Sequence, residues 1–66
     1  EPLSPRELEI LNLITAGRST KEIAAGLKLS INTANAHIKS IYRKTGVHTR
    51  RALIARAREL GLVKSS

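Results

Sequence analysis

The chain has 66 residues, a formal net charge of +7 and no cysteine. This length allows one small domain that buries only about 60% of its unfolded surface, so a deep catalytic cleft is not expected. Without cysteine the chain forms neither disulfides nor thiolate metal sites, which suits the cytoplasm. No apolar run approaches the roughly 18 residues of a membrane span, and no signal-peptide pattern opens the chain.

The positive charge is concentrated in one part of the sequence. Residues 1–22 contain three Lys or Arg and four Glu, whereas residues 23–66 contain nine Lys or Arg and one Glu. This asymmetry indicates a polyanionic partner, for which nucleic acid is a better candidate than an anionic membrane surface. An enzyme is not expected, because there are no paired carboxylates and no glycine-rich phosphate loop. We likewise expect no cofactor and no metal.

The first helix is predicted from its start and stop signals. Ser4 is a suitable N-cap, and Glu7 follows three residues later to complete a capping box. Leu3 and Leu8 fall at the two positions of a hydrophobic staple. Gly17 is expected to stop this helix.

A second, shorter helix is expected to begin at Ser19 or Thr20. Gly26 lies inside it at some cost in helix propensity, from which we expect a close helix–helix approach. Residues 28–30 then form a short turn, with Leu29 expected in the core.

The third helix is predicted between Ser30 and Gly46, and its two sides differ in chemistry. At about 100° per residue, the core-facing side collects Ile31, Ala34, Ile38, Ile41, Tyr42 and Thr45. The outward side collects Asn32, Asn35, Ala36, Lys39 and Arg43. Its flanks are Thr33, His37, Ser40 and Lys44. No acidic residue occurs on the outward side.

This outward side fits a helix that enters the major groove of double-stranded DNA. Asparagine pairs well with adenine, lysine with guanine, and alanine with a thymine methyl group. We predict base reading by Asn32, Asn35, Ala36, Lys39 and Arg43. Phosphates are expected at Ser19, Thr20, Lys21, Thr33, Ser40 and Lys44, the first three at a helix N-terminus with free N–H groups. For any one residue the alternative is an ordinary basic surface.

A fourth helix is expected between Thr49 and Gly61, after Val47 folds back on the core. Its wider stripe should pack inward and consists of Leu53, Ile54, Ala57 and Leu60. The other side presents Arg51, Ala52, Ala55 and Glu59. This strip is either a solvent-exposed face or the contact of a weak homodimer, whose two recognition helices would read an inverted repeat about 10 base pairs apart. Because no segment alternates with the period of a strand, the fold class is all-α.

At this point the sequence resembles the LuxR-type helix-turn-helix domain of bacterial transcription regulators. The residues that carry the resemblance are Leu3, Ser4, Arg6, Glu7, Gly17, Lys21, Glu22, Ile23, Ala24, Leu27, Leu29, Ser30, Thr33, His37, Ile41, Tyr42, Lys44, Val47, Thr49 and Arg50. The resemblance implies a four-helix domain whose third helix reads DNA and whose fourth helix contributes dimer contacts. It also implies that residues 1–66 are one domain, the C-terminal part of a larger cytoplasmic regulator, with RNA polymerase as a further candidate partner.

Positions implied by the family overlap with those derived from helix angles. They place base reading on Asn32, Asn35, Ala36 and Lys39, and phosphate contacts on Thr20, Lys21, Thr33 and Lys44. The sensor or ATP-binding domain that would control the protein is not indicated.

Three departures from the family pattern bear on specificity and stability. Asn35 replaces a usual Lys or Arg, which should shift base preference toward adenine. Ala34 replaces valine and Thr45 replaces leucine, so the core loses apolar bulk unless these positions are partly exposed or are compensated elsewhere. We therefore predict a marginally stable isolated domain, with a thermal midpoint not far above about 65 °C.

Other interpretations of the sequence are weaker. For His37, packing or a backbone hydrogen bond is a better interpretation than a metal ligand or a pH sensor. Tyr42 is the sole aromatic residue and should lie in the core rather than stack on bases. Region 4 of a sigma factor opens similarly, but the fourth helix argues against it. A membrane-surface or protein-binding bundle is the alternative from a different class.

Overall fold

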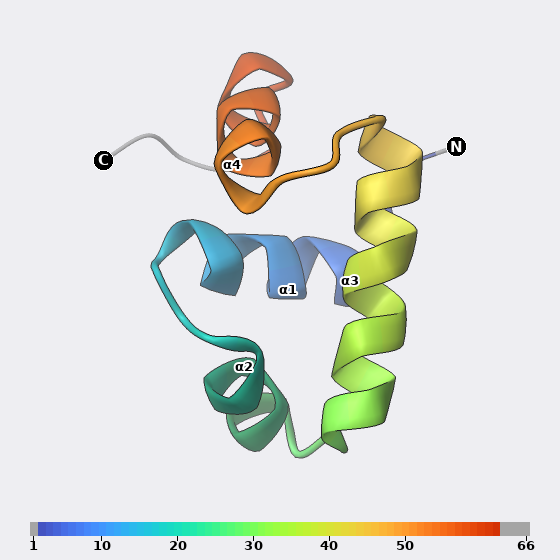
Figure 1. Ribbon diagram of the computed structural model, residues 1–66, viewed down its shortest axis with the longest axis vertical. Coiled ribbons are helices and arrows are strands. Elements are labelled where there is room, and N and C mark those ends of the chain that lie inside the picture. Colours follow the sequence, from blue (N-terminus) through green and yellow to red (C-terminus); the bar gives the residue numbers. More distant parts are fainter. Residues whose placement is uncertain (1, 63–66) are drawn as a thin grey trace.

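The computed structural model describes residues 2–62 and contains four α-helices joined by short connections (Figure 1). In chain order they are α1 (Pro5–Thr15), α2 (Thr20–Leu27), α3 (Ile31–Thr45) and α4 (Arg50–Glu59). No strand occurs in this described part of the chain. The prediction of an all-α, four-helix fold is confirmed.

Side-chain caps define where α1 and α2 begin. Ser4 Oγ accepts the N–H of Glu7 at 3.2 Å, and the Glu7 carboxylate accepts the N–H of Ser4 at 2.8 Å. This is the predicted capping box. The same arrangement recurs on α2, where Ser19 is the N-cap and bonds reciprocally with Glu22 at 2.9 and 3.1 Å. The second capping box was not predicted.

The ends of α3 follow the sequence signals. Ser30 Oγ accepts the N–H of Thr33 at 3.1 Å, and the helix ends at Gly46, whose φ of +74° is left-handed. Glycine adopts this conformation without the steric penalty of a side chain. Between α2 and α3, Lys28 also adopts a left-handed conformation, with φ +58°. This residue turns the chain sharply, so that only three residues separate α2 from α3.

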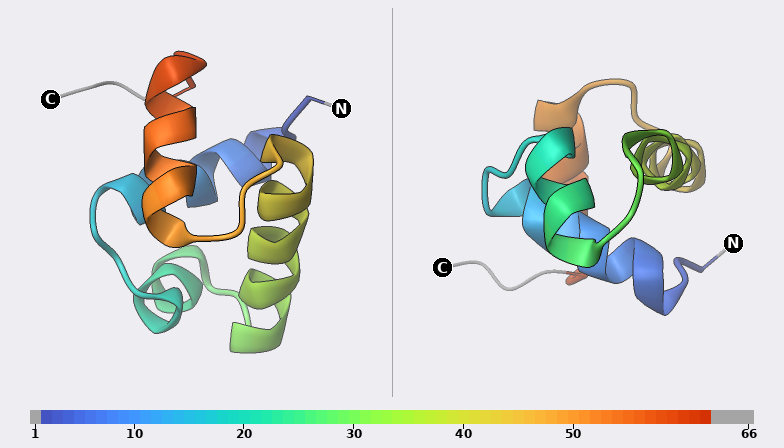
Figure 2. Two further views of the ribbon diagram at one scale, coloured as in Figure 1. Left: turned by 45° about the horizontal axis from the view of Figure 1, so that its top comes forward. Right: turned by 90° about the horizontal axis from the view of Figure 1, so that it is seen from below.

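The helices are arranged around α1. In Figure 1, α1 crosses the middle of the molecule, α2 lies below it and α4 above it, while α3 runs along one side of all three. The left view of Figure 2 keeps this order. Helix α3 packs against each of the other helices. The buried core comes from all four helices and consists of Ile10, Leu11, Ile14, Ile23, Ile41, Leu53 and Ala57.

Two expectations for the second helix and its turn are wrong. A Cβ atom added at Gly26 would meet nothing within 4 Å, so this glycine does not mark a close helix–helix approach. Leu29 is only half-buried and lies outside the core cluster, because the left-handed turn at Lys28 leaves it at the edge of the α2–α3 junction.

Two residues expected to pack inward are also exposed. Ile31 retains 49% of its surface and Leu60 retains 56%. Ile31 is the first residue of α3, at the end that has the short α2 beside it (Figure 1). Leu60 follows the last residue of α4 and lines an apolar pocket. Helix angles predict which side faces the core, but they do not show where a neighbouring helix stops.

The two small core residues of α3 are both buried. Ala34 is fully buried and Thr45 is 9% exposed, so the suggestion that they are partly exposed is wrong. The Thr45 hydroxyl donates to the carbonyl of Ile41 at 2.8 Å, which compensates for burying a polar group. Marginal stability of the domain remains a prediction.

Candidate nucleic-acid interface

Helix α2, the turn at residues 28–30 and helix α3 form a compact helix–turn–helix unit, in which the two helices contact each other. The core-facing side of α3 buries Ala34, Ile41 and Thr45. All five residues predicted to read bases are exposed on the other side, namely Asn32, Asn35, Ala36, Lys39 and Arg43. One continuous helix therefore holds them in a fixed relation to the core.

The outward side of α3 also has a shallow hollow of about 400 Å³. It is lined by two small residues, Ala36 and Ser40, and by the longer side chains of Lys39 and Arg43. The Arg43 guanidinium lies 3.5 Å from Ser40 Oγ. Small residues beside two cations leave room for a base edge or a phosphate to approach the helix.

The N-terminus of α2 presents a second group of predicted contacts. Lys21 is exposed, Thr20 is half-buried, and Ser19 is exposed but occupied by its capping box. The N–H groups of Thr20 and Lys21 stand in the first turn, where no preceding carbonyl of the helix can accept them. Glu22 carries a negative charge here, and the N–H of Ser19 lowers its pKa. Arg18 lies 3.9 Å from this carboxylate and offsets its charge.

Thr33 lies at the start of α3 and is exposed. Ser30 Oγ donates to Thr33 Oγ1 at 2.9 Å, so the Thr33 hydroxyl proton is left available for another acceptor. The side chain is thus positioned by the N-cap residue and is still able to donate to a phosphate.

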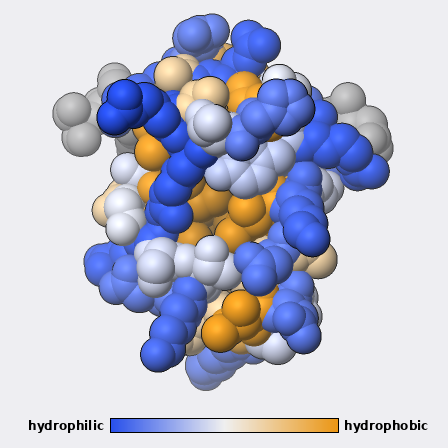
Figure 3. All heavy atoms as spheres, viewed as in Figure 1, coloured by the Kyte–Doolittle hydropathy of each residue, from blue (hydrophilic) through white to orange (hydrophobic). Residues whose placement is uncertain are grey.

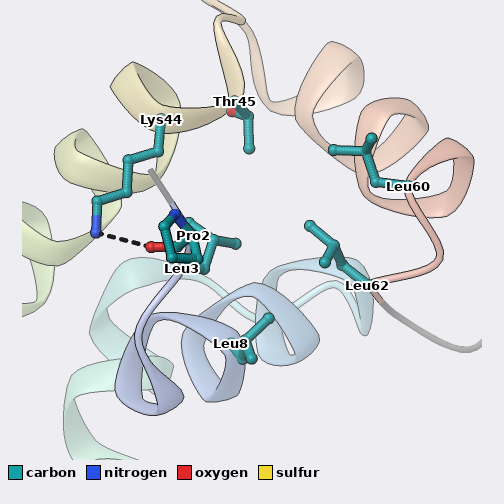
Figure 4. A pocket seen from close by; sticks show the side chains of 7 residues that line it. All are labelled: Pro2, Leu3, Leu8, Lys44, Thr45, Leu60 and Leu62. Atoms are coloured by element: carbon teal, nitrogen blue, oxygen red, sulfur yellow. Dashed lines mark hydrogen bonds between the residues drawn. The ribbon is translucent and has the colours of Figure 1, made fainter.

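Lys44 has a different environment from the other predicted phosphate contacts. Its Nζ lies 2.7 Å from Glu7 Oε1, and the two side chains are only 14% and 5% exposed. Lys44 also donates to the carbonyl of Pro2 at 3.4 Å (Figure 4). The Lys44 ammonium, together with the N–H of Ser4 and the hydroxyl of Ser40, lowers the pKa of Glu7 to about 2. The pair joins the start of α1 to the end of α3. The Lys44 ammonium, which was predicted to contact a phosphate, is therefore already paired with a carboxylate.

A second cation was given no role by the sequence but links two helices. Arg50 is the first residue of α4, and its guanidinium donates to the carbonyls of Ile14, at 3.3 Å, and Arg18. Helix α1 has no basic residue in its own last turn. Arg50 therefore supplies a positive charge to the negative end of the α1 dipole from another helix.

An apolar pocket of about 430 Å³ lies beside the Lys44–Glu7 pair (Figure 4). Its lining is drawn from the N-terminal segment, α1, the end of α3 and the segment after α4: Pro2, Leu3, Leu8, Lys44, Thr45, Leu60 and Leu62. None of the residues predicted to read bases lines it. The pocket and the outward side of α3 are therefore separate features.

The candidate dimer strip on α4 is partly accessible. Arg51, Ala55 and Glu59 are exposed, whereas Ala52 is half-buried. Glu59 also pairs with Arg56 of the same helix at 3.6 Å. The strip has the small residues that a close contact between helices requires.

The remaining surface gives few signs of other chemistry. His37 is half-buried on α3 and His48 is exposed in the connection to α4. Within residues 2–62, no group of three or more His, Asp or Glu side chains could hold a metal ion. No helix of this described part is long and apolar enough to cross a membrane. Figure 3 shows hydrophilic side chains surrounding a central apolar area on the face seen in Figure 1.

Comparison with known proteins places this geometry in context. The family described as "Bacterial regulatory proteins, luxR family" matches residues 1–57. The transcriptional regulatory protein MctR of Rhizobium johnstonii is 48% identical over 63 residues, which are 96% of this chain and 29% of MctR. The chain thus spans less than a third of that relative.

Two solved structures are similar to the present one. The response regulator ChrA of a heme-sensing two-component system superposes with a TM-score of 0.90 and 42% identity, over 94% of this chain and 31% of ChrA. The transcription factor GerE superposes with a TM-score of 0.86 and 37% identity, over 94% of this chain and 92% of GerE. The four-helix arrangement around α1 is therefore shared with regulatory proteins.

Proposed function

Because the chain belongs to the luxR family of bacterial regulatory proteins, we propose that it binds double-stranded DNA sequence-specifically, with α3 in the major groove. The observation that carries the proposal is the uninterrupted exposed side of α3, which contains amides and cations and no acidic residue. It lies opposite the buried stripe that fixes the helix to the core. A helix presented in this way fits the width of the major groove.

In this proposal two groups of residues have different tasks. Asn32 and Asn35 both donate to and accept from base edges, and Lys39 donates to them. Ala36 lies against a thymine methyl group, and Arg43 lies at the far end of the helix. Ser19, Thr20 and Lys21 hold a phosphate at the start of α2, and Thr33 and Ser40 hold further phosphates beside α3. In this proposal Lys44 mainly stabilises the fold, because the Glu7 carboxylate already neutralises its charge.

The first experiment is selection of bound sites from random duplex DNA with the 66-residue domain at about 100 mM salt. We expect enrichment of one half-site or of an inverted repeat. Binding without enrichment that disappears as the salt concentration rises would contradict sequence-specific reading, because purely phosphate contacts are strongly salt-dependent.

Single substitutions then distinguish the residues that read bases from the residues that hold phosphates. Asn35→Ala should reduce discrimination at one base pair by about 1–3 kcal/mol while binding to random DNA changes little. Lys21→Ala should weaken all duplexes alike and reduce the salt dependence by about one ion. Arg58→Ala is the matched control, because Arg58 is an exposed cation on α4, outside both groups. An unchanged preferred sequence in Asn35→Ala would refute the assigned reading side.

We also propose that α4 forms a weak homodimer through Arg51, Ala52, Ala55 and Glu59, which would pair two half-sites about 10 base pairs apart. In Ala55→Glu, a new charge on this strip should prevent cooperative binding to the inverted repeat and preserve binding to a single half-site. Equal cooperativity in the variant and the unsubstituted domain would exclude this surface. In the longer regulators that the family implies, RNA polymerase is a further candidate partner.

A further inference from the structure

Two large hydrophobic residues are exposed in the described structure, and they lie in different surroundings. Leu60 lines the apolar pocket beside Thr45 and Leu62, so it borders other apolar side chains (Figure 4). Ile31 lies at the first position of α3 and lines neither that pocket nor the core cluster. A single exposed isoleucine does not by itself indicate a partner, so the case for Ile31 depends on its place on α3.

Ile31 belongs to a row of side chains along α3. Residues four apart on a helix lie about 40° apart, one turn above another, and form a continuous ridge. The ridge that contains Ile31 continues through Asn35, Lys39 and Arg43, all of which are exposed. Ile31 is therefore the N-terminal member of the same ridge that the proposed function places in the major groove.

The position within the helix strengthens this relation. Recognition helices present their N-terminal residues to the base edges. Ile31 is exposed in the first turn of α3, as are Asn32 and Thr33, whereas Arg43 lies three turns later. If Asn35 reaches a base, the side chain one turn nearer the N-terminus points toward an adjacent base pair.

The charge around Ile31 favours DNA over a protein partner as its occupant. The first turn of α3 contains no acidic residue. From residue 23 to residue 58 the sequence contains no Asp or Glu at all. An apolar side chain surrounded by amides and cations complements a polyanion with apolar groups on its base edges.

We propose that Ile31 is a specificity-determining residue that contacts the C5-methyl group of a thymine in the half-site. The inference rests on the proposed function, because it requires α3 to lie in the major groove. The thymine methyl is the distinctive apolar group that base edges expose there, and apolar side chains recognise it by direct contact. Ile31 thus adds recognition of a thymine next to the base pair that Asn35 reads.

Replacement of single thymines by deoxyuridine tests this contact, because the substitution removes the methyl group and leaves the base-pairing edge unchanged. On the selected half-site, one such replacement should weaken binding of the unsubstituted domain about threefold to fivefold, the effect of one apolar methyl group. Ile31→Ala should bind the thymine and deoxyuridine duplexes equally well. Ile31→Val, which keeps the branched shape, should show a smaller thymine preference.

Leu60→Ala is the matched control, since it removes an equally exposed aliphatic side chain away from α3. It should retain the full thymine preference. Circular dichroism and urea unfolding verify that each variant is folded, and Ile31→Val provides the measurement if Ile31→Ala is unfolded.

The outcomes distinguish this inference from the proposed function. If an enriched site exists and Asn35→Ala alters it, but no deoxyuridine replacement distinguishes Ile31→Ala from the unsubstituted domain, the Ile31 contact is refuted and DNA reading stands. If no site is enriched, both are refuted. A thymine preference that is lost in Ile31→Ala, reduced in Ile31→Val and retained in Leu60→Ala supports the contact.

Discussion

The N-termini of α1 and α2 carry the same capping box, but their tertiary surroundings differ. In α1, Glu7 is 4% exposed, and its carboxylate pairs with Lys44 from the far end of α3. In α2, Glu22 is exposed, and its nearest cation is Arg18, one turn earlier in sequence at 3.9 Å. The same local motif therefore serves as a buried tie between two helices in one case and as a surface cap in the other.

This difference assigns separate tasks to the two helix starts. At the α1 terminus the Glu7 carboxylate is buried and neutralised by Lys44, so this pair stabilises the fold. The α2 terminus is open beside the exposed Lys21, so its N–H groups remain accessible to an anion. Substitutions at equivalent positions should accordingly affect stability at α1 and DNA binding at α2.

The largest effect is expected for Lys44→Ala. Removal of the ammonium leaves a nearly buried Glu7 carboxylate with only its capping partners, which should lower the free energy of unfolding by about 3 kcal/mol. Urea unfolding at pH 7 measures the change. In the matched control, Lys21→Ala, stability should change by less than about 0.5 kcal/mol. Equal stability of the two variants would mean that the Lys44–Glu7 pair contributes nothing.

Acidification should destabilise the domain by protonating Glu7 of the same pair. The pKa of Glu7 is about 2 in the folded state, below its ordinary value of 4.5. Its stabilisation is therefore complete above about pH 4.5 and is lost as the pH falls toward 2, which should amount to about 2–3 kcal/mol. The urea concentration at the midpoint of unfolding, measured between pH 7 and pH 2, should fall with this loss of stability. In Glu7→Gln the loss should be much smaller, and an equally steep decline in that variant would contradict the assignment.

Substitution of either capping serine should have an intermediate effect on the stability of the domain. Ser4→Ala and Ser19→Ala each remove one N-cap acceptor, which should destabilise the domain by about 1 kcal/mol in both cases. Thermal unfolding provides the comparison. Only Ser19→Ala should also weaken binding to random duplex DNA, because Ser4 lies on α1, outside the residues proposed to contact phosphates. Loss of DNA affinity in both variants would point to a general effect of stability.

The smallest effect is expected for Glu22→Gln. Glutamine preserves the capping box and Glu22 has no buried partner, so stability should change by less than about 0.5 kcal/mol. Removal of a negative charge beside the proposed phosphate site should slightly increase affinity for DNA at low salt. Reduced affinity, measured by fluorescence anisotropy, would argue against a phosphate at this terminus.

Local chemistry made several parts of the fold predictable. Caps at Ser4, Ser30 and Thr49, and the stop at Gly46, follow from backbone groups that each helix must satisfy near its own ends. The resemblance to LuxR-type regulators, read from the sequence, is confirmed by the family match. The side of α3 that faces outward was predictable as well, because the helix period places its residues whatever the neighbours are.

Contacts between distant residues were not predictable in the same way. Nothing near Lys44 in sequence indicates an acidic partner, since Glu7 lies 37 residues away. Ile31 fits the apolar stripe by angle, yet it is exposed because the first turn of α3 has only the short α2 beside it. Gly26 suggested a close approach that the packing does not contain.

Four helices, the caps at Ser4, Ser30 and Thr49 and the exposed side of α3 follow from the amino-acid sequence alone, because they depend on periodicity and on hydrogen bonds within a few residues. The packing of the helices was needed to show that Lys44 links α3 to α1 and that Arg50 caps α1 from α4. It also decided that Ile31 extends the exposed ridge of α3. The physical reason is that burial and charge pairing depend on where each neighbouring helix ends, and side-chain spacing along one helix does not contain that information.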